Sequence, residues 1–328
     1  MSIDFFTDPK QKRKVLTPIV HNNLWNIYKK QQAVIWTMEE IDWTNDKQNF
    51  ETLDDQEQEF LLNIVAFFAS SDMIIVDNLF DHFMSQVTVA ECKSFYTLQA
   101  FIETVHSETY SKILEVLIHD EEKRRTLANA VHFKKPIKNK AKWAEKYMNP
   151  DIPFKQRLWA FCIFEGVLFS ASFCAIYWLR KKNKCHGITY SNELIARDEG
   201  LHALFAIEMY NMYDNPADEE IIHTILKDAV TLEEDFVRYS FNGKRFIGMN
   251  ADSMIQYVQY CADHILSLLK GPSGKYSPIW NVENPFPWMD MISIDSKTNF
   301  FEKRTAEYQL PSVGLPQNSK DFTLSEDF

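Results

Sequence analysis

The sequence predicts an all-α protein built as one large helical bundle. Only 8 of its 328 residues are glycines, and long stretches of the chain contain no turn signal. Long gaps between turn signals favour helices over a fold of many short strands. With 45% hydrophobic residues the chain can bury one large core, although its length alone also allows two domains.

The spacing of apolar residues divides the chain into helical segments. We expect helices over residues 22–40, 56–87, 90–118, 153–182, 191–213, a segment from 215 onward, and 250–269. Residues 1–20 are polar and are expected to form an irregular arm. The lysine-rich residues 134–140 are expected to form a solvated connection, and residues 271–300 are expected to be mostly irregular because they contain several prolines.

Local signals support the beginnings of several of these helices. Asp54 is followed three residues later by Glu57, which is typical of a capping box. Pro153 is placed where a first helical turn tolerates proline. Ser191 and Asn250 can each cap the helix that follows them.

Residues 158–179 form a mostly apolar stretch that is long enough to cross a membrane. Glu165 lies inside it, and a carboxylate at the middle of a bilayer costs about 2.5–3.5 kcal/mol on insertion scales. We therefore interpret the stretch as a helix that is buried on all sides in the bundle, and we expect no membrane association.

Charge and cysteine content narrow the possible partners and compartment. The chain has 35 basic and 46 acidic residues, a net charge of −11, which argues against nucleic acid or an anionic membrane as its main partner. Its five cysteines form no C-x-x-C pair and lie mostly in apolar runs, which favours reduced core thiols. The N-terminal residues lack the apolar stretch of a signal peptide, so we expect a cytoplasmic protein.

Two Glu-x-x-His units carry the strongest chemical signal. Residues three apart lie on one face of a helix, so Glu103 with His106, and Glu199 with His202, can each present two ligands to one metal. A single acid on an earlier apolar helix precedes each unit: Asp72 precedes the first and Glu165 precedes the second. The same pattern thus occurs twice and predicts that two metal ions lie between Asp72, Glu103, His106, Glu165, Glu199 and His202.

The composition of this ligand set indicates which metals it would hold. Buried lone carboxylates are strongly disfavoured unless they are paired or bound to a metal. Four carboxylates and two imidazoles suit two divalent first-row metals, and the absence of cysteine argues against a thiolate zinc site. Two similar pairs, Glu220 with His223 and Glu115 with His119, lie toward polar segments and are interpreted as solvated side chains.

Several residues are expected to lie next to the metals. Tyr110 follows His106 by four residues on the same helix face, where it is either an oxidisable neighbour of the metals or a plain core tyrosine. Phe169, Phe173 and Ile195 would line the same pocket by their spacing from the ligands. Asp198 either hydrogen-bonds a metal-bound histidine or is an exposed charge paired with Arg197.

These motifs resemble the small, radical-generating subunit of class I ribonucleotide reductase, of the type found in eukaryotes and large DNA viruses. The resemblance covers nearly the whole chain. It rests on the helix from Glu103 through His106 to Tyr110, the segment from Ser191 to His202, Glu165-Gly166 with Phe169 and Phe173, the segment that begins at Trp36, residues 297–304 and the ending 322–328.

The resemblance implies a ferritin-like helical bundle at residues 21–300 that forms a homodimer. The six ligands would bind two iron ions per chain, with manganese as the alternative because it accepts the same ligand types. The iron(II) centre would react with dioxygen and oxidise Tyr110 to a stable radical. A tyrosine, rather than the phenylalanine of radical-free relatives, occupies this position.

The resemblance also implies a route from the radical to a large subunit, which reduces ribonucleoside diphosphates to deoxyribonucleoside diphosphates. Trp36, Asp198 and His106 would begin this route, and Tyr308 would continue it in a flexible tail at residues 301–328. The end of the tail would dock on the large subunit, because it offers three apolar anchors between acids: Phe322, Leu324 and Phe328.

Other functions remain open from the residues alone. The chain could be another di-iron oxidase of the desaturase or hydroxylase type, which would leave the tail without a role. It could also be a non-catalytic iron-binding protein. A degenerate regulatory subunit is a further alternative, against which the complete ligand set counts.

Overall fold

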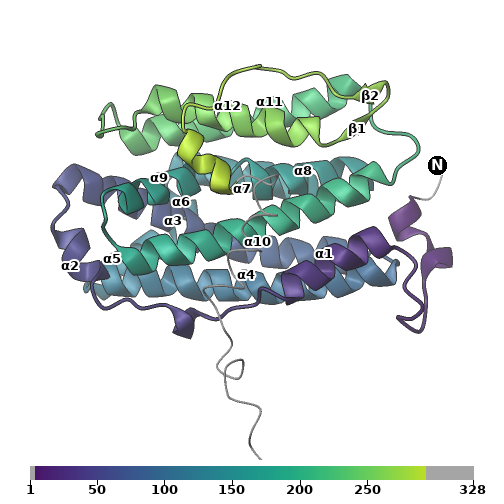
Figure 1. The fold of residues 1–328 in the computed structure, drawn as a ribbon, viewed down its shortest axis with the longest axis horizontal. Coiled ribbons are helices and arrows are strands. Elements are labelled where there is room, and N and C mark those ends of the chain that lie inside the picture. The colour runs from purple at the N-terminus through teal and green to yellow at the C-terminus, as the bar shows by residue number, and fades with distance from the viewer. Residues whose placement is uncertain (1–3, 293–328) are drawn as a thin grey trace, which may run out of the picture.

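A computed structural model describes residues 4–292, apart from the side chains of residues 71–76, 78–81, 148 and 290–292. Nearly all of the regular structure in this range is helical (Figure 1). The α-helices are α1 (Asn22–Gln32), α2 (Asp46–Glu51), α3 (Asp55–Asn78), α4 (Ala90–Leu117), α5 (Glu121–Ala128), α6 (Ala130–Phe133), α7 (Lys135–Met148), α8 (Phe154–Gly166), α9 (Ser170–Lys181), α10 (His186–Asn211), α11 (Glu219–Phe241) and α12 (Ala251–Ser267).

Shorter elements complete the described part of the chain. A two-stranded antiparallel hairpin pairs β1 (Lys270–Gly271) with β2 (Gly274–Lys275). A π-helical segment, η4 (Leu79–Met84), continues α3. The short 3-10 helices are η1 (Phe5–Thr7), η2 (Pro9–Gln11), η3 (Met38–Glu40) and η5 (Pro287–Ile292).

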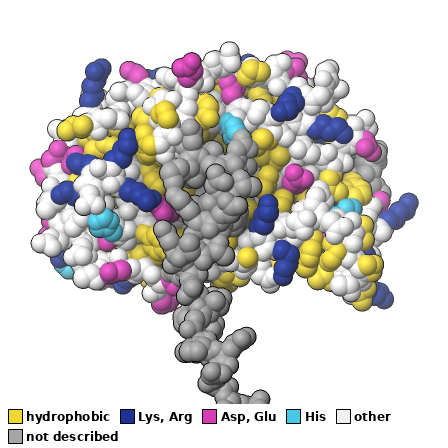
Figure 2. Space-filling model, in the orientation of Figure 1, with side chains coloured by type: hydrophobic (Ala, Val, Ile, Leu, Met, Phe, Trp, Pro, Cys, Tyr) yellow, Lys and Arg dark blue, Asp and Glu magenta, His cyan; other side chains and the backbone are white. Residues whose placement is uncertain are grey.

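The long helices lie side by side around one core. In Figure 1, α11 and α12 form one edge of the bundle, α1 and α4 form the opposite edge, and α10 runs between them. The most extensive packing is between α10 and α8 and between α3 and α4. The prediction of an all-α bundle is therefore confirmed. The surface facing the viewer in Figure 2 intersperses acidic, basic and hydrophobic side chains.

Several helix boundaries follow local chemistry, as the sequence predicts. Helix α4 matches the expected helix over 90–118 to within one residue. The backbone N–H of Glu57 donates to Asp54 at 2.8 Å, and the Glu57 carboxylate accepts the Asp54 N–H at 3.3 Å, so the capping box is confirmed. Asn250 caps α12 by accepting the N–H of Ser253 at 3.0 Å.

Four expectations about helix extent were wrong. The lysine-rich residues 134–140 do not form a solvated connection, because α7 begins at Lys135 and buries Lys140. The segment 153–182 is two helices with a break at residues 167–169. The helix over 22–40 ends at Gln32, and the helix expected over 56–87 gives way to η4 after Asn78.

The start of α10 was also expected too late in the chain. It begins at His186 rather than near Ser191, because the buried carboxylate of Asp46 in α2 accepts the N–H groups of Gly187 and Ile188 at 3.0 and 2.8 Å. These are donors that a first helical turn leaves without an intrahelical partner. A side chain distant in the sequence thus supplies the cap.

The apolar stretch around Glu165 lies inside the bundle. Residues 154–181 include a window long and apolar enough to cross a membrane, and 94% of that window is buried by the rest of the protein. This burial agrees with the interpretation of the stretch as a core helix.

Candidate metal centre

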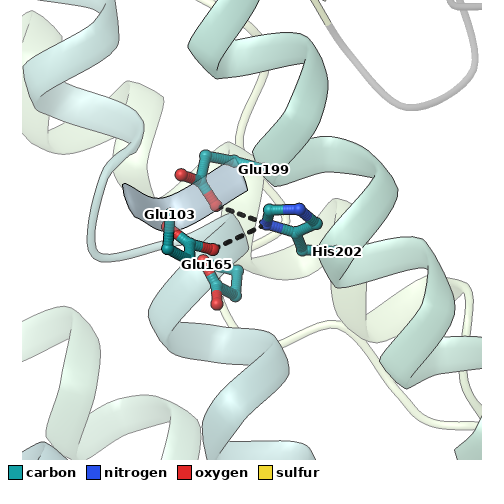
Figure 3. A group of neighbouring side chains, drawn as sticks. All are labelled: Glu103, Glu165, Glu199 and His202. Atoms are coloured by element: carbon teal, nitrogen blue, oxygen red, sulfur yellow. Dashed lines mark hydrogen bonds and ion pairs between the residues drawn. The ribbon is translucent and has the colours of Figure 1, made fainter. Parts of the chain in front are cut away.

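Three helices bring together a buried cluster of carboxylates and imidazole. Glu103 comes from α4, Glu165 from α8, and Glu199 and His202 from α10 (Figure 3). One ligand atom from each of these four residues lies within 4.8 Å of the others, and all four residues are buried. The two Glu-x-x-His units are therefore on facing helices and point into the same space.

The two histidines lie on either side of a pair of carboxylates. Nδ1 of His202 is 3.0 Å from Glu103 and 3.1 Å from Glu199. Nδ1 of His106 is 3.1 Å from the other oxygen of Glu199 and 3.3 Å from the other oxygen of Glu103. Glu103 and Glu199 thus lie between the imidazoles, which is the arrangement that bridging ligands of a two-metal site require.

The electrostatics of the cluster fit bound cations. Burial favours neutral imidazole, but Glu103 and Glu199 outweigh it and raise the pKa of His202 to about 9. Burial also favours neutral carboxyl, yet hydrogen bonds with Glu165, His106 and His202 hold the pKa of Glu199 well below its usual range. The carboxylates that favour positive charge on the imidazoles would equally favour metal cations between them. The donor set fits a pair of divalent metals.

Asp72 belongs to α3, which packs against α4 beside this cluster. Its side chain lies outside the described residues, so the prediction that Asp72 is a sixth ligand stays a prediction.

Gln99 is a polar neighbour of the cluster that sequence reasoning missed. Its side-chain amide donates to Glu165 at 3.1 Å and to Glu103 at 3.4 Å. It orients two carboxylates from different helices. Its position four residues before Glu103 on α4 is the signal that could have revealed it.

Asp198 connects His106 to the early tryptophan. One carboxylate oxygen accepts the indole N–H of Trp36 at 2.7 Å and lies 3.3 Å from Nε2 of His106. The other accepts the Gln31 amide at 3.1 Å and Arg197 at 3.0 Å. Of the two interpretations offered above for Asp198, the exposed charge does not hold, because Asp198 is fully buried.

The hydrogen bonds to Asp198 keep it ionised in the core. Burial would raise the pKa of its carboxyl, but the charge of Arg197 and hydrogen bonds with His106 and Trp36 hold that pKa far below its usual range. Gln31 was not singled out from the sequence. It lies on α1, and no spacing along the chain relates it to Asp198.

Tyr110 is buried in α4, one turn beyond His106. Phe68 stacks on its ring with the centroids 4.5 Å apart and the planes nearly parallel. Phe173 and Phe169 in turn lie 5.1 and 5.4 Å from Phe68. Phe68 is therefore the direct neighbour of Tyr110 that the sequence reasoning missed, although it precedes Asp72 by one helical turn.

Ile195 is also buried, in α10 one turn before Glu199. Its assignment to the pocket rests on this position in the helix.

The other acid–histidine pairs lie apart from the cluster. Glu220 is exposed, and His223 contacts the backbone oxygen of Ser277 at 3.0 Å. Glu115 is exposed and pairs with Lys112, while His119 is exposed on the surface. Glu220, Glu115 and His119 are solvated, in agreement with the sequence analysis, whereas His223 is half-buried.

The predicted tail residues, by contrast, receive no structural description. Tyr308, Phe322, Leu324 and Phe328, together with residues 297–304, lie outside the described residues.

Comparison with known proteins adds a consistent set of relatives. The family model described as "Ribonucleotide reductase, small chain" matches residues 13–285. The chain is 44% identical over 316 residues to the ribonucleoside-diphosphate reductase small chain of Plasmodium falciparum (isolate Dd2). This alignment covers 96% of this chain and 89% of that protein. It is 40% identical over 320 residues to the small chain of vaccinia virus (strain Ankara), with 98% of each chain covered.

A solved structure shows the same fold. The ribonucleotide reductase Rnr4 homodimer from Saccharomyces cerevisiae superposes with a TM-score of 0.78 at 27% sequence identity, covering 89% of this chain and 90% of that one.

Proposed function

Because this chain belongs to the ribonucleotide reductase small-chain family and is the small subunit of a ribonucleoside-diphosphate reductase, we propose that it stores its oxidising power as a radical on Tyr110. The observation that carries the proposal is the burial of this tyrosine one turn beyond His106, with the ring of Phe68 stacked on it. Exclusion of water and of reductants is what a long-lived phenoxyl radical needs.

Different residues would bind the metals and carry the radical. Glu103, Glu199 and the two histidines would hold the metals, with Asp72 and Glu165 completing the set. When bound, a pair of redox-active ions supplies the one-electron oxidation of Tyr110, with dioxygen as the oxidant. Tyr110 would give up one electron to this oxidant and its phenolic proton to the oxygen that is reduced, and the surrounding phenylalanines would shield the radical that remains.

The proposed path toward the large subunit begins at the buried network of Asp198. The indole N–H of Trp36 donates a hydrogen bond to Asp198, which also faces His106, so an electron and a proton could leave along adjacent groups. Tyr308 would continue the path, and the large subunit would reduce the ribonucleoside diphosphate.

The experiment that tests this function is electron paramagnetic resonance on metal-free protein that is loaded with iron(II) without oxygen and then exposed to air. We expect a tyrosyl radical, and turnover of ribonucleoside diphosphates when the large subunit is added. Two bound ions without any radical would refute the assignment to Tyr110 under iron. Loading with manganese(II) in parallel distinguishes the two metals, because both accept this donor set.

We expect Glu103→Ala to lower bound iron from two ions per chain to one or none. Glu103 lies between both histidines, so its loss removes a ligand from each metal position. Metal analysis after anaerobic loading and gel filtration measures the change. Glu115→Ala, an exposed acid on the same helix, is the matched control and should keep both ions. Retention of two ions in Glu103→Ala would remove it from the ligand set.

Deletion of residues 322–328 is expected to leave the radical intact and to abolish turnover. These residues offer apolar anchors for a groove on the large subunit, and they lie outside the described residues. The affinity for the large subunit, measured by surface plasmon resonance, should fall at least tenfold. That loss corresponds to about 1.4 kcal/mol of binding free energy. Unchanged binding would place the docking site elsewhere.

We also propose a cytoplasmic homodimer with iron as the resident metal. All five cysteines are free thiols, four of them buried, which suits a reducing compartment. The yeast Rnr4 neighbour is a homodimer, which supports the same assembly here. Light scattering on the purified chain measures the state, and a monomer mass at micromolar concentration would refute it.

A further inference from the structure

The break between α8 and α9 lies next to the candidate metal centre. It interrupts an otherwise continuous apolar segment. Helix α8 ends at Gly166, immediately after Glu165, and α9 begins at Ser170. The N–H of Val167 and that of Leu168 both bond to the carbonyl of Ile163, at 2.8 and 3.1 Å. The backbone groups on either side of such a break lose regular helical partners and need others.

Lys140, from α7, reaches the break. Its side chain is fully buried, and its Nζ donates to the carbonyl oxygen of Leu168 at 2.7 Å. The same Nζ lies 2.5 Å from a carboxylate oxygen of Glu233 in α11, and Glu233 is fully buried as well. One ammonium group therefore joins the break to a second helix.

Glu233, in α11, completes the buried pair. Burial raises the pKa of its carboxyl, and the charge of Lys140 opposes that rise. The connection between α11 and the break therefore runs through the ammonium group of Lys140, which contacts both the Glu233 carboxylate and the Leu168 carbonyl.

Burial makes this ion pair costly. Desolvation lowers the pKa of Lys140 to about 8 against the opposing charge of Glu233. Buried ion pairs often contribute no more stability than apolar residues of similar size, and some are kept because they specify one arrangement. The aromatic rings beside the ammonium group of Lys140 indicate that this pair specifies the packing around Tyr110.

Three phenylalanine rings connect Lys140 to Tyr110. The Nζ of Lys140 is 3.3 Å from the ring centroid of Phe67. Phe67 packs against Phe169, which lies within the break next to the clamped Leu168 carbonyl, with the ring centroids 5.6 Å apart. Phe169 contacts Phe68, and Phe68 stacks on Tyr110.

We infer that Lys140 and Glu233 are positioning residues for the tyrosine pocket: their ion pair clamps the α8–α9 break and thereby holds Phe169 and Phe68 against Tyr110. The effect on a radical rests on the proposed function, whereas the effect on the break and on the pocket does not. Neither residue contacts the metal cluster directly, so we expect both metal ions to remain bound when the clamp is removed.

The test compares Lys140→Met/Glu233→Met with the parent protein. Methionine has a similar volume and leaves no unpaired charge behind. The control is Lys142→Met/Asp235→Asn, which changes two exposed charges on the same two helices. If the double variant does not fold, Lys140→Met alone serves, because Glu233 can then take up a proton.

Two measurements use metal-free protein. Amide hydrogen exchange in the peptide that spans residues 167–172 should be at least tenfold faster than in the parent, while exchange within α4 stays unchanged. In protein labelled with 3-fluorotyrosine, the Tyr110 resonance, identified by its loss in Tyr110→Phe, should shift or broaden. With iron bound, the radical should decay at least fivefold faster at unchanged metal content.

The outcomes separate the clamp from the proposed function. Exchange and a Tyr110 resonance equal to those of the parent would overturn the clamp, as would a changed break with an unchanged Tyr110 resonance. A parent protein that forms no radical would refute the proposed function alone, and the two metal-free measurements would still decide the clamp.

Discussion

Tyr110→Phe is expected to abolish the radical while both metal ions remain bound. Phenylalanine lacks the phenolic group whose one-electron oxidation stores the oxidising equivalent, so turnover with the large subunit should fall to the background of the assay. Phe68 stacks on the face of the ring, and that contact survives the substitution. Loss of one buried hydroxyl should change the free energy of unfolding by only about 1 kcal/mol. Electron paramagnetic resonance and metal analysis on one sample measure both parts.

Tyr96→Phe provides the control for this experiment. Tyr96 is another buried tyrosine on α4, and its hydroxyl donates to the sulfur of Met209 at 3.1 Å. It lacks the stacked phenylalanine of Tyr110, and its variant should keep the radical and the turnover. A tyrosyl signal that persists in Tyr110→Phe and disappears in Tyr96→Phe would move the assignment to Tyr96.

Asp198→Asn is expected to separate radical formation from radical transfer. The substitution is nearly isosteric, but it removes the ionised acceptor of the Trp36 indole proton. Since positioned acid–base groups contribute roughly 10²–10⁴-fold to rate, turnover should fall by about two to four orders of magnitude. The radical at Tyr110 should still form. Steady-state turnover and the intensity of the radical signal are measured on the same preparation.

Glu208→Gln, on the same helix, is the matched control, because Glu208 contacts only the surface residue Asn23 among the described residues. Full turnover in Asp198→Asn would show that the transfer route does not pass through Asp198. Loss of the radical itself would show instead that Asp198 acts by orienting His106, which it contacts at 3.3 Å.

The parts of the fold that the sequence predicted are those that local chemistry decides. Helix α4 and the caps at Asp54 and Asn250 depend on residues within one turn of each other. The break after Gly166 was missed because the apolar pattern continues through it. At Gly166 a Cβ atom would lie 2.2 Å from a side-chain atom of Ile265 in α12, a contact that only the assembled bundle reveals.

Helix α7 was missed for a related reason. Its lysines suggested a solvated segment. Among the five lysines of α7, the sequence gives no indication that Lys140 alone is buried. The partner that makes its burial tolerable, Glu233, is on a distant helix and lies in an acidic stretch of its own.

The metal cluster was accessible from the sequence because its ligands come in pairs three residues apart. The Glu103 and Glu199 units needed only helical geometry to be recognised. Gln31 reaches Asp198 through tertiary packing, so no local spacing marked it. Phe68 lies four residues before Asp72, but only the packing of α3 on α4 shows that its ring stacks on Tyr110.

The cap that Asp46 places on α10 bears on the order in which the protein is assembled. Asp46 lies 141 and 142 positions before the two amides that it accepts. Contacts of such high sequence separation form slowly, because a long loop must close first. Glu199 and His202 follow the first turn of α10. The cap on the helix that carries these two predicted ligands therefore forms only once this loop has closed, and the full predicted ligand set requires the first 202 residues of the chain.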